Sequence, residues 1–83
     1  MGFNEERLQI RGRLADAEHK ARQMEIRLQA LASSIRGALP AFCRSEEIEA
    51  AKAAALAVEL ASLHADYLGL LGEIKAMKNA LGL

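Results

Sequence analysis

The chain has few of the residues on which small folds with special chemistry depend. It has 83 residues, with one cysteine, one proline, one tyrosine, two phenylalanines and no tryptophan. A lone cysteine cannot form a disulfide within the chain and, without a secretion signal, favours a reducing cytoplasm. A compact monomer of this size buries only about 60–65% of its unfolded surface, which leaves it marginally stable. Partner chains are therefore the remaining source of stability.

Net charge and long apolar runs are also missing. Eleven basic residues balance eleven acidic ones, so no global field draws the chain to nucleic acid or to an anionic membrane. The longest apolar run is AAALAV, residues 53–58, whereas a membrane-spanning helix needs about 20 residues. The start MGFNEE fits neither a signal peptide nor the usual myristoylation pattern. We therefore expect a cytoplasmic protein that does not use a membrane.

Helical periodicity is abundant, and it first predicts a helix over residues 4–37. Asn4 is the expected N-cap, followed by two glutamates at the positive end of the helix dipole. Apolar residues then recur in alternating steps of three and four, which is typical of helices that pack along their length. Arg7 interrupts this series, which consists of Phe3, Ile10, Leu14, Ala17, Ala21, Met24, Leu28, Leu31, Ile35 and Ala38.

The segment after Gly37 predicts a bend rather than a kink. Gly37 is a suitable helix C-terminus, and Pro40 would clash with a continuing helix. Ser45 is a suitable new N-cap, followed by Glu46 and Glu47. A helix-ending glycine, a helix-breaking proline and a new N-cap so close together favour a turn over residues 38–45. We expect Phe42 to pack against the helix ends.

A second helix is predicted over residues 46–81, with Gly82 closing it. Its apolar residues follow the same spacing: Ala53, Leu56, Leu60, Leu63, Tyr67, Leu70, Ile74, Met77 and Leu81. Two helices of similar length with a short connection predict an all-α, antiparallel helical hairpin, a single domain spanning residues 1–83. The expected core consists of Leu56, Leu60, Leu63, Tyr67, Leu70 and Ile74 with Ile10, Leu14, Met24, Leu28 and Leu31. A bend centred on Phe42 would place Leu14 opposite Leu70 and Ile10 opposite Ile74.

The second helix is too apolar to be satisfied by one neighbour. Between Glu46 and Leu81, 22 of 36 residues are apolar, compared with 13 of 33 between Glu5 and Gly37. Another apolar series runs beside the first: Ala50, Ala54, Ala57, Ala61, His64, Leu68 and Leu71. A surface of this extent is typical of an interface. The sequence therefore predicts a homodimer in which two hairpins form a four-helix bundle, with docking onto another helical protein as the alternative use of the same surface.

Sites for chemistry are not apparent in the sequence. A di-metal site needs several glutamates and Glu-x-x-His motifs on facing helices, and Asp16-x-x-His19 is the nearest approach, pointing away from the core. Cys43 has Arg44 beside it but no histidine, and we expect an inert loop thiol or an intersubunit disulfide. His64 is expected at the edge of the interface. We predict no catalytic, cofactor-binding or metal-binding residues, and no enzyme activity.

The expected function is that of a non-enzymatic structural and interaction protein, a self-associating hairpin acting as an assembly or adaptor module. No named family is matched by its motifs. Its arginine-rich first arm, its GxxP break at Gly37–Pro40 and its alanine-rich second arm are similar in layout to small helical-hairpin accessory proteins of bacterial and prophage genomes. Any antiparallel coiled coil shares these features, and the resemblance implies no site residues. The alternative function is a small regulator of that kind, binding another protein or nucleic acid through the first helix, although interleaved acidic residues and scarce aromatics disfavour nucleic acid.

Overall fold

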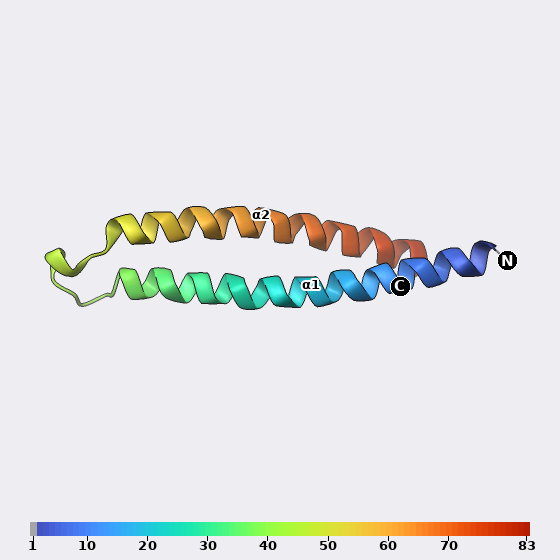
Figure 1. Ribbon diagram of the computed structural model, residues 1–83, viewed down its shortest axis with the longest axis horizontal. Helices are drawn as coiled ribbons and strands as arrows, with labels where there is room; N and C mark the ends of the chain where they lie inside the picture. Colours follow the sequence, from blue (N-terminus) through green and yellow to red (C-terminus); the bar gives the residue numbers. More distant parts are fainter. Residues whose placement is uncertain (1) are drawn as a thin grey trace.

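The computed structural model is a helical hairpin (Figure 1), and it describes the backbone of residues 2–83 and the side chains from residue 4 onward. Helix α1 runs over Gly2–Ala38, a short 3-10 helix η1 over Ser45–Glu47, and helix α2 over Ala50–Leu81. The two long helices run antiparallel and pack against each other along their length. The predicted all-α hairpin is thus confirmed.

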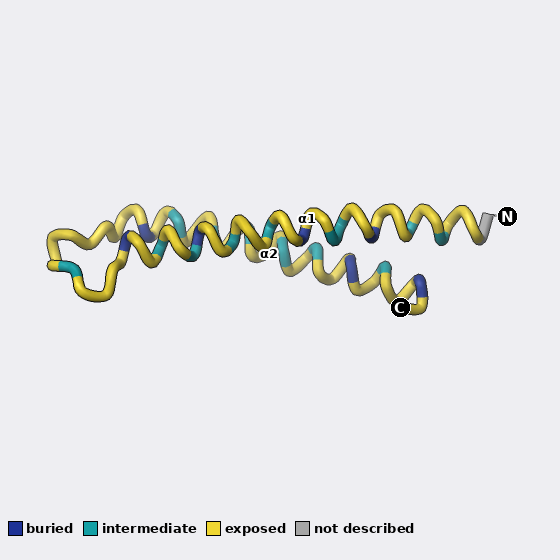
Figure 2. Tube along the Cα trace, turned by 90° about the horizontal axis from the view of Figure 1, so that it is seen from below, coloured by how far each residue is buried: buried dark blue, intermediate teal, exposed yellow. Residues whose placement is uncertain are grey.

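The molecule is a thin rod. Its principal extents are 67 × 15 × 15 Å and its radius of gyration is 18.8 Å, whereas a compact chain of this length would have a radius of about 12 Å. The first turns of α1 project beyond the end of α2 (Figure 1). Comparison of the two views shows that the helices also twist about each other, since they lie apart at opposite ends in Figures 1 and 2.

The predicted core residues lie where the two helices meet. Buried and half-buried positions recur along the facing sides of both helices (Figure 2). In the predicted series, every residue from Ile10 onward is buried or half-buried; Phe3 lies outside the described side chains. The fully buried members are Leu14, Ala21, Leu31 and Ala38 from α1 with Ala53, Ile74 and Leu81 from α2. The heptad pattern therefore identified the packing face of each helix correctly.

The turn differs from the prediction, because α2 begins at Ala50 instead of near residue 46. Ser45 starts η1 instead of capping α2, and the backbone N–H of Arg44 donates to the Glu47 carboxylate at 3.3 Å. Ile48 then has extended backbone angles, which ends this short turn. The Glu49 N–H donates to the Ala38 carbonyl at 3.1 Å and closes the connection between the two helix ends. This backbone bond closes the hairpin after η1 and so delays the start of α2.

Phe42 was expected to pack against the helix ends, and this prediction was wrong. Its side chain is 102% exposed at the tip of the hairpin. The Glu49–Ala38 bond already joins the two helix ends, so the segment containing Phe42 bulges outward from it. Leu39 and Ile48 are also exposed nearby, so that the tip is an apolar surface.

The predicted pairing register was also wrong, by about one helical turn. Leu14 belongs to the same buried cluster as Ile74 and Leu81, and the expected partner Leu70 is only partly buried against that cluster. The guanidinium of Arg7 donates to the carbonyl of Leu81 at 3.3 Å, although the expected register would place Arg7 beside Met77. The reason is the delayed start of α2: helices that end at Ala38 and begin at Ala50 are centred beyond Phe42.

The helix ends partly match the prediction. Gly82 has φ 76°, and the Leu83 N–H donates to the Lys78 carbonyl at 2.8 Å, which confirms the glycine-terminated end of α2. Helix α1 begins at Gly2, so Asn4 lies within it and is not its N-cap. Arg7, the polar interruption of the apolar series, lies where α2 ends and satisfies a terminal carbonyl there.

Candidate interaction surface

The two long sides of the hairpin differ in chemistry. One side, the charged flank, has basic residues every seven positions on α1 and acidic residues every seven positions on α2. The basic residues are Arg13, Lys20 and Arg27, and the acidic ones are Glu73, Asp66 and Glu59. Arg27 forms an ion pair with Glu59, and the antiparallel direction then places the other two oppositely charged pairs at equal spacing along the rod. The charged flank is therefore complementary within the chain.

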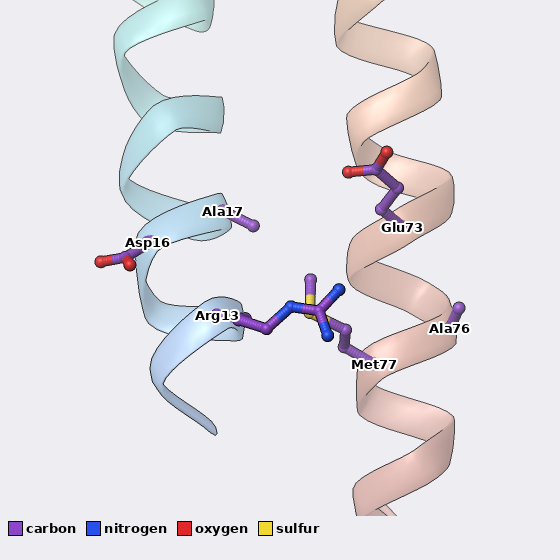
Figure 3. A pocket seen from close by; sticks show the side chains of 6 residues that line it. All are labelled: Arg13, Asp16, Ala17, Glu73, Ala76 and Met77. Carbon is purple, nitrogen blue, oxygen red and sulfur yellow. The ribbon is translucent and has the colours of Figure 1, made fainter. Parts of the chain in front are cut away.

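Figure 3 shows one part of this flank. Arg13 extends from α1 across the gap toward the side chain of Met77, with Glu73 one turn further along α2. Asp16 points away from the gap, so that it does not oppose Glu73. The hollows on this flank are open on one side and are lined mainly by these charged residues and the edge of the core. They are surface grooves of the hairpin.

Reversing one charge on this flank is expected to destabilise the hairpin slightly. Arg27→Glu places a second carboxylate beside Glu59, and because both side chains are largely exposed the expected loss is at most about 1 kcal/mol. The double variant Arg27→Glu with Glu59→Arg should recover that loss. Urea unfolding followed by circular dichroism measures both variants, and a double variant no more stable than the single one contradicts the pairing.

The other side, the apolar flank, is the surface that the sequence predicts as an interface. Its seven residues are all exposed: Ala50, Ala54, Ala57, Ala61, His64, Leu68 and Leu71. Leu68 is 53% exposed and Leu71 is 38% exposed. These residues are therefore accessible to another molecule, although Leu71 is also partly covered by the packing between the two helices.

Two exposed glycines also lie on the surface of α2. Gly69 and Gly72 have open space where a side chain would be, so neither is required for close packing within the chain. The accessible surface of the whole chain is 6204 Å², about 1,300 Å² more than the area typical of a compact 9.0 kDa monomer. Specific interfaces bury about 800 Å² on each partner. The excess reflects the thin shape of the rod and is distributed over all of its sides.

Helix α2 is long and apolar enough to cross a membrane, although its apolar residues do not form one unbroken run. Its most apolar 18-residue stretch has a mean hydropathy of 1.3, and none of that stretch is buried. The flank acids Glu59 and Asp66 lie in the middle of the helix, however, and a charged residue at the centre of a bilayer costs at least about 2.5 kcal/mol.

A hydrogen bond links the two helices at the edge of the apolar flank. The Tyr67 hydroxyl donates to Oε1 of Glu25 at 2.7 Å. This bond, together with desolvation and the negative charge of Glu25, raises the pKa of Tyr67 above its ordinary value of 10.0. Glu18 and Glu25 on α1 line a hollow with Leu71 and Lys78 on α2, so the border of the apolar flank carries both charges.

The raised pKa of Tyr67 predicts a loss of stability in alkali. Folding favours the neutral phenol, so this stabilisation is complete below pH 10 and disappears as the pH rises through the folded-state value. Tyr67→Phe removes the group that ionises. We expect the stability of the wild type to approach that of the variant above pH 10, as measured by thermal unfolding; a constant difference across that range would contradict this origin.

Within the described residues, the groups that could bear chemistry lie apart. No cluster of three or more histidine, cysteine, aspartate or glutamate side chains suited to a metal ion occurs there. His19 is exposed on α1, His64 is exposed on the apolar flank, and Cys43 is half-buried in the turn. The structure does not bring these residues together.

Two features of the surface were missed by the sequence reasoning. The alternation of Arg13, Lys20 and Arg27 with acids at the same spacing on α2 was visible in the sequence, and matching the charges would have improved the register. The apolar tip formed by Leu39, Phe42 and Ile48 had no such signal, because its exposure depends on the path of the turn.

In comparisons with known proteins, no protein-family model, no curated protein and no solved structure matches this chain.

Proposed function

We propose that this protein is a non-enzymatic assembly module, a cytoplasmic helical hairpin whose function is to self-associate through the apolar flank of α2 into a dimeric four-helix bundle. The observation that supports this proposal is the exposure of Leu68 and Leu71 in a continuous apolar series that the core of the hairpin does not use. Covering that series with a second copy needs no other component. A dimer also supplies the stability that a two-helix rod of this length lacks.

Self-association is favoured over insertion into a membrane by the distribution of charge. The charged flank places Glu59 and Asp66 near the centre of α2, and Glu59 forms an ion pair with Arg27 of α1. A membrane-spanning α2 would have to break this ion pair or bring the polar α1 with it. A helical surface beside a charged flank is instead suited to packing against another helix in water.

The regulator alternative depends on α1 being free to bind. Arg27 is paired with Glu59, Arg7 with the end of α2 and Arg36 with the Ser33 hydroxyl, so three of the seven basic residues of α1 already have partners within the hairpin. Acidic side chains are interleaved with the remainder. These contacts favour self-assembly as the proposal, and nucleic-acid binding becomes an outcome that the experiment must separate from it.

Sedimentation of the purified chain in reducing buffer tests the proposed function. We expect a mass twice the 9.0 kDa of the chain, dissociating to the monomer only on strong dilution. A single species of monomer mass at high micromolar concentration would overturn the proposal. Sedimentation with phosphatidylcholine vesicles, and separately with double-stranded DNA at two salt concentrations, identifies the competing outcomes, because the protein should remain in solution and unbound in both.

A further inference from the structure

We infer that two copies pair through their α2 helices in an antiparallel arrangement whose two-fold axis lies between Ser62 and Leu63. This inference rests on the proposed function and specifies its geometry. The apolar flank has small residues at one end and large ones at the other: four alanines, Ala50 to Ala61, precede His64, Leu68 and Leu71. This asymmetry distinguishes the possible arrangements of two copies.

Size complementarity selects the antiparallel direction. In a parallel pair related by a two-fold axis each residue meets its own copy, so alanine would face alanine in one half and leucine would face leucine in the other. The first half would leave voids and the second would force the helices apart. Reversing one copy places the small half of each helix against the large half of the other, and the helices then lie at a uniform separation.

Size complementarity also selects one register among those that keep the apolar flanks of the two α2 helices in contact. With the axis between Ser62 and Leu63, Ala61 faces His64, Ala57 faces Leu68, and Ala54 faces Leu71. A shift that moves the facing positions by seven residues in one direction places Ala57 against Ala61. The opposite shift places His64 against Leu68. Only the central register opposes a small residue to a large one at each of these layers.

Charge supports this arrangement independently of size. The C-terminal part of α2 carries Lys75 and Lys78, and the turn before α2 carries Glu46, Glu47 and Glu49. Glu46 and Glu47 are largely exposed and form ion pairs with Arg44 of the same chain, and Glu49 forms one with Lys52. The antiparallel register brings the lysines of each copy alongside the glutamates of the other, whereas a parallel pair brings lysine beside lysine. With Arg44, Lys52 and Glu73 included, residues 44–52 carry a net charge of −1 and residues 73–78 a net charge of +1, so that the two ends are weakly complementary.

The length of the overlap suits this occupant. About 26 residues of each α2, from Ala50 to Lys75, overlap in the proposed register, a length of about 39 Å. The hairpin tip of each copy also comes beside the C-terminal end of the other copy's α2, where the exposed Leu83 offers Phe42 an apolar neighbour.

Cross-linking with single-cysteine variants tests the direction and the register together. Each variant carries Cys43→Ser to remove the natural thiol, and adds either Ala57→Cys or Leu68→Cys. We expect rapid disulfide formation under mild oxidation when the two variants are mixed, and none when either is oxidised alone. Both substitutions are at exposed positions, and circular dichroism verifies that each variant remains helical.

The other outcomes each contradict the inference in an identifiable way. A disulfide from Ala57→Cys alone indicates parallel pairing. Preferential cross-linking of Ala50→Cys with Leu68→Cys, or of His64→Cys with Leu68→Cys, indicates a register shifted by seven residues. A dimer mass without any of these cross-links overturns the antiparallel α2 pairing but leaves self-association standing, whereas a monomer mass overturns both.

Discussion

Replacing Ile74 with aspartate is expected to unfold most of the hairpin at room temperature. Ile74 is only 8% exposed and belongs to the main buried cluster with Leu14, Ala21 and Leu81. An aspartate there loses the apolar contacts and buries a charge without a partner, with a combined cost of about 3–5 kcal/mol. The whole stability of a chain of this length is about 4–12 kcal/mol, and a thin two-helix rod should lie at the lower end of that range.

Circular dichroism and thermal unfolding measure this effect, and Ala76→Asp is the matched control. Ala76 is exposed on the same part of α2, so the control introduces the same charge at a similar distance from the helix end. We expect Ala76→Asp to keep the wild-type helicity and nearly the wild-type melting temperature. If Ile74→Asp melted together with the control, the two helices would not depend on the packing face that the structure shows.

Replacing Ala61 with glutamate is expected to dissociate the dimer while the hairpin stays helical. Ala61 lies next to the proposed two-fold axis, so the substitution introduces two carboxylates close together in a surface that should become buried. Burying two carboxylates close to each other at the axis makes association unfavourable, and we expect the dissociation constant to rise at least about 100-fold. Within the single chain Ala61 is exposed, so folding of the hairpin should be almost unaffected.

Sedimentation equilibrium measures this effect, with Ala55→Glu as the control. Ala55 is an exposed alanine on the same helix, but it projects from a side away from the apolar flank. The control should keep the wild-type mass and affinity. An Ala61→Glu protein that sediments like the wild type would show that the apolar flank is not the interface, even if the protein is a dimer.

These two substitutions separate the two uses of the apolar residues of α2. One series stabilises the hairpin from within, and its removal changes helicity. The other is exposed in the hairpin, and we expect its disruption to change the mass of the particle in solution. Because the two series are offset by about a quarter turn around the same helix, one chain of 83 residues can commit one side of α2 to folding and another to association.

The sequence by itself determined the helices, their packing faces and the bend. Residues spaced three and four apart can share one face only in a helix, so the spacing alone assigns Leu14, Leu31 and Ile74 to the core. Proline cannot continue a helix, and glycine readily ends one. The break after Ala38 and the end of α2 at Gly82 are therefore also determined by nearby residues. The excess of apolar residues on α2 followed from composition and spacing.

The tertiary structure alone decided the register of the two helices, the path of the turn and how deeply each core residue is buried. Shifting one helix by a turn keeps both apolar faces in contact, so the periodic pattern cannot distinguish the two registers. The backbone bond between Glu49 and Ala38 sets the length of the turn, which moves the start of α2 and exposes Phe42. Leu63 and Ile74 are equivalent in the sequence pattern, yet Ile74 is buried and Leu63 only half-buried, because burial depends on what the opposite helix places there.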